Sequence, residues 1–203
     1  MKRTLALLLL SLSAVLANIS QWVPDADSLV TGEDPEGEWG DSELLAVRLF
    51  DYYPPIETRS FMHFDLPEAP PDTYIDYGIL ELDLDRVDYP GGEIGIYKVT
   101  ESWDESTVNW NNQPTYDPAK MMFHGWIHDV DIVDIRLEGE VLQEWVCDPS
   151  ENYGMIFATY NYSSPLSIFF YSRESDSSPI LWLHPDPYPV ESLSWGVIKA
   201  IEW

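Results

Sequence analysis

Cysteine and basic residues are scarce in this chain. Its 203 residues include one cysteine and ten lysines or arginines, against 36 aspartates and glutamates. The single Cys147 excludes an internal disulfide framework, so stability must come from packing, to which a bound cation could add. The formal charge of −26 disfavours nucleic acid and anionic lipid as partners, because binding a phosphate backbone needs clustered lysine and arginine.

Motifs of catalysis and of transition-metal binding are also missing. The sequence has no G-x-S-x-G elbow, no H-E-x-x-H helix and no glycine-rich phosphate loop, and its four histidines have no metal-type spacing. Glycosidases use a pair of carboxylates, but acidic residues are so abundant here that such a pair would occur by chance and is no evidence for catalysis. We therefore expect a protein that is not an enzyme.

Long apolar runs are confined to the start of the chain. Lys2 and Arg3 precede an apolar run that extends from Leu5 to Leu16, shorter than the roughly 20 residues needed to span a bilayer. The ending Val15-Leu16-Ala17 has the small residues of a signal-peptidase site. We interpret residues 1–17 as a signal peptide and expect a secreted or cell-surface protein without stable membrane insertion.

The remaining sequence has ample material for a core. Hydrophobic residues make up 45% and aromatic residues 14% of the chain, which argues against disorder. Leu80, Leu82 and Leu84 alternate with acidic residues, a period typical of strands buried on one face. Further strand-like segments, separated by proline and glycine, are Phe61–Leu66, Ile94–Val99, Met155–Thr159, Ser167–Tyr171 and Ile180–Leu183. This pattern predicts an all-β, antiparallel β-sandwich over residues 18–184.

Two segments depart from the strand pattern. Leu137, Val141, Leu142 and Trp145 recur at helical spacing, so we expect a short helix that caps the sandwich. Residues 185–203 begin with a proline-rich linker and continue as a short amphipathic tail, which either docks on the sandwich or serves for attachment.

The segment Trp103–Pro114 reads W-D-E-S-T-V-N-W-N-N-Q-P. It resembles the signature of the DNRLRE family, which is also classed among carbohydrate-binding modules and is akin to disaggregatase-related repeats. Other landmarks of that family follow in the same order over about residues 26–184: Arg59–Leu66, Ile75–Leu84, Ile94–Val99, Val141–Trp145, Tyr153–Met155, Ser172–Glu174 and Pro179–Leu181.

The resemblance implies a jelly-roll-type β-sandwich in a secreted or cell-surface protein, often appended to enzymes or adhesive chains. Some members bind acidic polysaccharides such as alginate. Two features depart from that picture: we expect this module to stand alone, and its negative charge disfavours an anionic glycan.

Most residues of the signature are expected to stabilise the fold rather than to bind a ligand. Val108 and Trp110 share a face and Trp103 can pack beside them, so we expect Trp110 in the core. By the same reasoning, Arg173 with Glu174, and Arg59 with the Asp65 carboxylate, are expected to be internal ion pairs rather than sites.

Aromatic side chains in polar, loop-like context are the candidates for ligand binding. Sugars present flat apolar faces ringed by hydroxyls, so rings flanked by Asp, Asn or Glu suit them. The best candidate is the turn Tyr160-Asn161-Tyr162, which pairs two rings with an amide. The other candidates, each of which could instead be a half-buried core residue, are Trp39, Tyr52, Tyr53, Tyr116 and Trp126.

Acidic clusters raise the alternative of a calcium ion. Glu33-Asp34 with Glu36, or Asp25 with Asp27, could supply oxygen ligands to Ca²⁺. Neither group follows EF-hand spacing, so solvated acids are the preferred interpretation and the metal stays unassigned.

The sequence therefore favours a non-catalytic module that binds polysaccharide at the cell surface or in extracellular matrix. The alternative is a structural subunit of an extracellular surface structure or fibre, which would assemble with copies of itself through exposed strand edges or the tail.

Overall fold

The computed structural model describes residues 20–185, except residues 51, 71–72, 89–90, 129–130 and 162–164. The predicted signal peptide (residues 1–17), Tyr162 and the tail beyond Pro185 lie outside the described residues. Within these ranges, no helix is long and apolar enough to cross a membrane.

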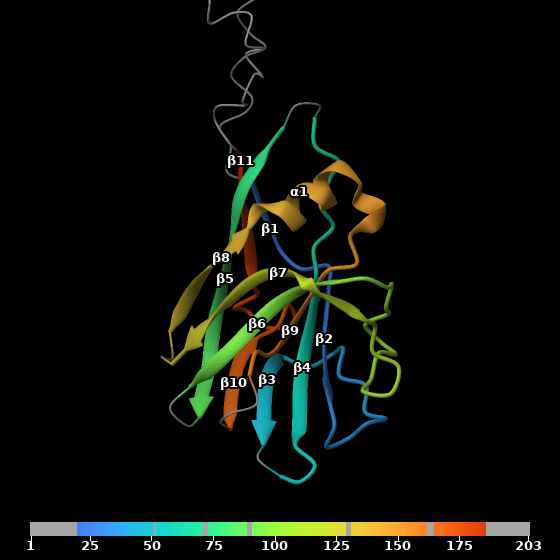
Figure 1. Ribbon diagram of the computed structural model, residues 1–203, viewed down its shortest axis with the longest axis vertical. Helices are drawn as coiled ribbons and strands as arrows, with labels where there is room; N and C mark the ends of the chain where they lie inside the picture. Colours follow the sequence, from blue (N-terminus) through green and yellow to red (C-terminus); the bar gives the residue numbers. More distant parts are fainter. Residues whose placement is uncertain are drawn as a thin grey trace, which may run out of the picture.

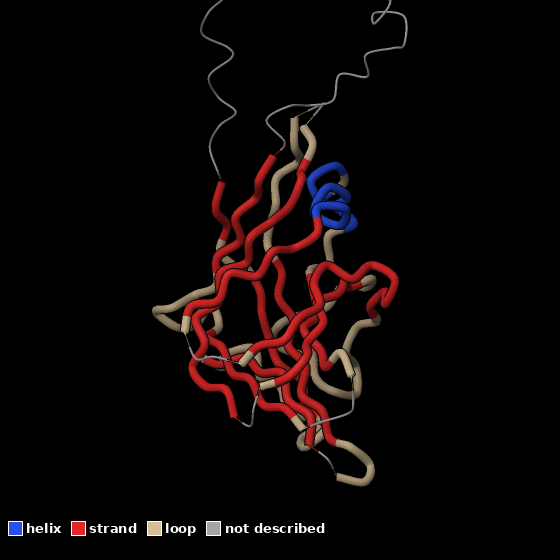
Figure 2. The backbone as a smooth tube through the Cα atoms, turned by 60° about the vertical axis from the view of Figure 1, so that its left-hand side comes forward, coloured by secondary structure: helices blue, strands red, loops and turns tan. Residues whose placement is uncertain are grey.

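The described chain is mostly β, with antiparallel strands and one short α-helix (Figures 1 and 2). The strand order is β1-β11-β5-β10-β3-β4-β9-β6-β7, with β2 beside β4 and β8 beside β5. The elements are β1 (Ser20–Trp22), β2 (Ala26–Thr31), β3 (Leu44–Phe50), β4 (Ile56–His63), β5 (Ile75–Asp88), β6 (Gly92–Val99), β7 (Tyr116–Ile127), β8 (Ile132–Glu138), α1 (Gly139–Cys147), the 3-10 turn η1 (Pro149–Glu151), β9 (Met155–Thr159), β10 (Leu166–Tyr171) and β11 (Ile180–Pro185).

The long strand β5 makes the sheet curl. Its residues 75–83 pair with β8 on one side and β11 on the other, whereas residues 84–88 pair with β10. One strand thus belongs to both parts of the sheet, which fold towards each other over a common core (Figure 1). The predicted all-β class is confirmed, and the jelly-roll connectivity stays a prediction.

The main core lies inside this curl and extends beneath α1. The alternate residues Leu80, Leu82 and Leu84 of β5 are at most 5% exposed. The helix buries Val141, Leu142 and Trp145 against the same core, so the predicted helical cap is confirmed. Leu137 is equally buried but belongs to β8 rather than to the helix, because the helix begins at Gly139.

A second apolar cluster lies on the opposite surface of the sheet. Phe61 and Ile156, from β4 and β9, are fully buried there. The covering layer comes from residues 100–115, here called the signature loop, which contributes Val108, Trp103 and Trp110. This cover explains why all five residues of β9, and the adjacent Phe61 and Met62 of β4, are buried instead of alternating with exposed residues.

The expectation for Trp110 is only partly right. Its ring joins the second cluster but is half-buried, with the Arg59 guanidinium 5.0 Å from the ring centroid. The segment around it is a series of turns rather than a strand, because Asp104 and Asn109 accept hydrogen bonds from backbone N–H groups two residues ahead. The buried residues of the segment are Val108, which is 2% exposed, and Pro114.

Candidate functional site

Five side chains gather where β6, β7 and the end of β9 lie side by side. His124 and Trp126 point to the same side of β7, and Trp126 pairs with Glu93 across from it on β6. Tyr160 directly follows β9, and its backbone N–H donates to the Glu93 carbonyl at 3.1 Å. The Tyr160 ring stacks on the His124 imidazole, with centroids 3.6 Å apart. Together with Asn161, these residues form what we call the outer aromatic face.

The Glu93 carboxylate is the polar centre of the outer aromatic face. The Asn161 side-chain amide donates to Glu93 Oε2, and His124 Nε2 lies 3.6 Å from Glu93 Oε1. Trp126 is 50% exposed and Tyr160 is 43% exposed, so the ring surfaces are accessible. Exposed ring planes therefore stand beside an oriented carboxylate and amide, which is the combination that sugar faces and hydroxyls require.

Tyr97 and Tyr116 extend this surface towards the signature loop. Their ring centroids are 5.3 Å apart, and the pKa of the Tyr97 hydroxyl is raised, first by burial and then by Tyr116 and Tyr160. The Tyr97 ring lies over Gly95, where a Cβ atom would come within 2.4 Å of the Tyr97 hydroxyl. The absence of a side chain at Gly95 thus lets the ring lie flat against β6.

The structure divides the aromatic residues that the sequence nominated. Tyr160, Asn161 and Trp126 meet in the outer aromatic face, and Tyr116 lies at the other end of β7. Trp39 instead lines a separate groove of about 390 Å³ beside Arg48. Tyr52 and Tyr53 are exposed at the β3–β4 connection, and Tyr162 lies outside the described residues.

Sequence reasoning missed His124 and Glu93. His124 could have been found, because the alternation of His124 and Trp126 with Phe123, Gly125 and the buried Ile127 is typical of a strand and puts the two rings on one face. Glu93 had no comparable signal, because its role depends on β7 and β9 flanking β6 from distant parts of the sequence.

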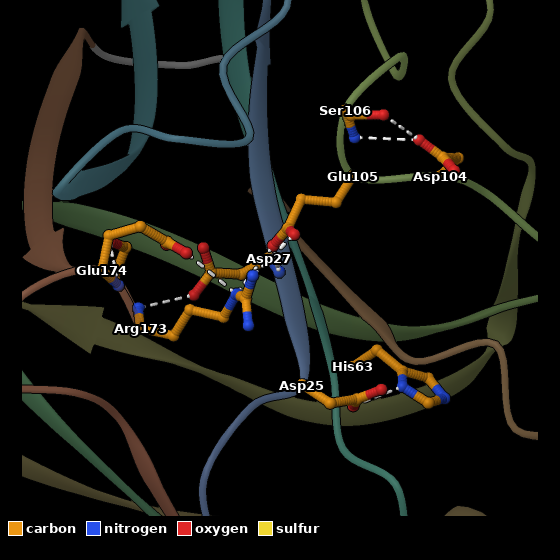
Figure 3. A network of polar contacts seen from close by, with 9 residues as sticks. Asp25, Asp27, His63, Asp104, Glu105, Ser106, Arg173 and Glu174 are labelled. Atoms are coloured by element: carbon orange, nitrogen blue, oxygen red, sulfur yellow. Dashed lines mark hydrogen bonds and ion pairs between the residues drawn. The ribbon is translucent and has the colours of Figure 1, made fainter.

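A cluster of charged groups occupies a different place, between β2, the signature loop and the turn after β10 (Figure 3). Arg173 makes a bidentate ion pair with Glu105, both N–O distances being 2.8 Å, and its Nε lies 3.0 Å from Glu174 Oε1. Asp27 is 1% exposed, and its Oδ2 accepts from the Arg173 backbone N–H at 2.8 Å. We call Asp27, Glu105, Arg173 and Glu174 the acidic cluster.

The observed contacts can be compared with the ion pairs and the calcium ligands that the sequence suggested. The Arg173–Glu174 pair is confirmed, and Arg59 forms an ion pair with Glu57, at 2.7 Å, where the sequence suggested Asp65. Asp25 and Asp27 do not share a site, because Asp25 pairs with His63 at 2.6 Å and Asp27 faces the acidic cluster (Figure 3). Of the other predicted ligands, Glu33 is engaged by Arg48 at 2.9 Å.

Comparison with known proteins gives a single assignment. No curated protein matches the chain significantly. The family model of carbohydrate-binding module family 96 matches residues 18–185, which include every described strand and the outer aromatic face. A family of carbohydrate-binding modules is a family of non-catalytic polysaccharide binders, in agreement with the missing catalytic motifs. The chain therefore belongs to carbohydrate-binding module family 96.

Proposed function

We propose that the chain binds polysaccharide through the outer aromatic face. The observation that supports this choice is the His124–Tyr160 stack, which stands exposed beside Trp126 and the Glu93 carboxylate. Rings held by strand pairing and by stacking lose little conformational entropy when a sugar docks on them, so binding energy is retained. Of the other nominated residues that the structure describes, Trp39 lines a separate groove and Tyr52 and Tyr53 are exposed at the β3–β4 connection.

The preferred ligand is a neutral or amino-substituted glycan. The acceptor at the centre of the outer aromatic face is a carboxylate, and the chain as a whole has a formal charge of −26. A uronic-acid polymer would bring its carboxylates against Glu93 without gaining a cation from this face, and like charges held close in a partly dry site repel. Sugar hydroxyls or ammonium groups can instead donate to Glu93.

We also propose the finer assignments that the sequence favoured. The basic and apolar pattern of residues 1–17 supports export, and hence action at the cell surface or in extracellular matrix. The ordered landmarks from Arg59 to Leu181 support a DNRLRE-type module, and the curled antiparallel sheet is compatible with jelly-roll connectivity.

Affinity electrophoresis against neutral, amino-substituted and uronic-acid polysaccharides tests the site and the ligand class together. Y160A and H124A should each abolish the retardation of the parent by its best ligand, while leaving the melting temperature within about 2 °C. Y74A is the matched control, because Tyr74 is a similarly exposed tyrosine, at 54%, in the segment before β5 and is not part of the outer aromatic face.

Two other outcomes would redirect the proposal. Full binding by Y160A and H124A combined with loss in W39A would move the site to the groove at Trp39. Retention by uronic-acid polymers alone would refute the ligand class. Sedimentation of the same samples checks the self-assembling alternative, which predicts multimers that do not depend on added glycan.

A further inference from the structure

The acidic cluster contains two buried carboxylate oxygens that receive no hydrogen bond from the described residues. Asp27 Oδ1 and Glu174 Oε2 are buried and accept no hydrogen bond from any described group. Their sister oxygens are engaged, Asp27 Oδ2 by the Arg173 backbone and Glu174 Oε1 by the Arg173 side chain. A buried, unsatisfied carboxylate oxygen is costly, so something outside the chain is expected to compensate it.

The geometry of these carboxylates suits a single ion. One oxygen from each of Asp27, Glu105 and Glu174 lies within 4.8 Å of the other two. Oxygens bound to a common ion 2.3–2.6 Å away are separated by up to roughly 5 Å, so one cation can reach all three. Figure 3 shows the three side chains converging from separate segments of the chain.

The charges of the cluster point to a divalent ion. Three carboxylates face one guanidinium, which leaves two negative charges to balance. Asp27 is 1% exposed and its Oδ1 has no partner among the described groups, so bulk water does not compensate its charge.

Access to the cluster is also acidic. A pocket of about 400 Å³ is lined by Glu105, Arg173 and Glu174, and also by Glu38 and Asp41. The two additional carboxylates attract cations to the pocket, which has room for the water ligands that complete a calcium shell.

We propose that Asp27, Glu105 and Glu174 bind one calcium ion, which ties β2, the signature loop and the turn after β10 together. All ligands are hard oxygens from flexible side chains, a set that suits Ca²⁺ better than Mg²⁺, which demands short and regular octahedral geometry. Arg173 orients two of the three carboxylates. The site lies outside the outer aromatic face and does not depend on glycan binding.

Isothermal titration of the full chain with CaCl₂, after dialysis against EDTA, tests the site directly. We expect one ion per chain, and a melting temperature about 5–10 °C higher at a calcium concentration a hundred times Kd. D27N retains an acceptor for the Arg173 N–H but should weaken binding at least tenfold, and E174Q, at a less buried position, should do the same. D134N, at an exposed position on β8, is the charge-matched control and should bind as the parent does.

Two results would overturn the proposal. The first is a parent that neither releases heat nor changes its melting temperature with calcium; if D27N then also melts above the parent in EDTA, a proton shared by Asp27 and Glu174 explains both oxygens. The second is calcium binding of equal strength in D27N, E174Q and the parent, which would put the ion elsewhere.

Discussion

Trp103 offers the sharpest test of how the signature loop is held on the sheet. Its indole Nε1 donates to the Tyr153 carbonyl at 2.9 Å, and its ring centroid lies 5.6 Å from that of Phe61. Trp103→Phe removes the donor but keeps a ring, so it should lower the free energy of unfolding by about 1 kcal/mol. Trp103→Ala also removes the aromatic pair and, for a half-buried ring, roughly 100 Å² of buried apolar surface, for a loss of about 4 kcal/mol in total.

Urea unfolding at fixed pH, followed by circular dichroism, measures both variants. Trp39→Ala is the control, because Trp39 is 39% exposed and should cost less than half as much as Trp103→Ala. The reasoning fails if Trp103→Ala costs less than about 1 kcal/mol. It also fails if Trp103→Phe is as damaging as Trp103→Ala, because the ring packing would then contribute nothing.

Three further predictions concern other positions. Gly95→Ala should displace the Tyr97 ring, weaken glycan binding and lower the free energy of unfolding by about 1–3 kcal/mol; unchanged affinity would show that Tyr97 does not support the face. Gly154→Ala should cost at least about 1–2 kcal/mol in urea melts, because Gly154 has φ +83° and a Cβ there would meet the Met62 carbonyl oxygen at 2.4 Å; a neutral variant would refute this. Hydrogen bonds from Lys120 and Lys98 lower the pKa of Glu144 below its ordinary 4.5, so this stabilisation is present above that value and is lost as the pH falls through the lowered pKa. The parent should accordingly lose stability more steeply than Glu144→Gln in urea melts below about pH 4.5, and parallel curves would contradict the assignment.

The strands that the sequence revealed are those with one clear apolar face or a compact β-branched and aromatic run. Leu80, Leu82 and Leu84 mark β5, and the segments Met155–Thr159 and Ile180–Leu183 match β9 and β11 closely. The sequence pattern does not predict β7, because this strand begins with Tyr-Asp-Pro-Ala-Lys, a polar stretch with a proline that is typical of a loop. A strand at the end of the sheet order tolerates that composition, since one of its sides needs no partner strand.

The candidate site was predictable only in part, for a physical reason. Aromatic residues in polar context could be nominated one by one, and Tyr160 and Trp126 both lie beside Glu93. Their placement depends on β6 pairing with β9 on one side and β7 on the other, contacts between segments more than 50 residues apart in the case of β9. No local pattern encodes such pairing. The same limit hid the acidic cluster, whose three carboxylates, Asp27, Glu105 and Glu174, come from distant parts of the sequence.

The pairing of β1 with β11 has a mechanical consequence. Ser20 lies opposite Leu183 and Trp22 opposite Leu181, so the chain enters and leaves the described domain at neighbouring points on one edge. A pulling force applied through the two ends would load the hydrogen bonds of this antiparallel pair one after another rather than all together. The domain should therefore peel open at low force from that edge, while β6, β7 and β9, which carry the outer aromatic face, stay outside the line of tension.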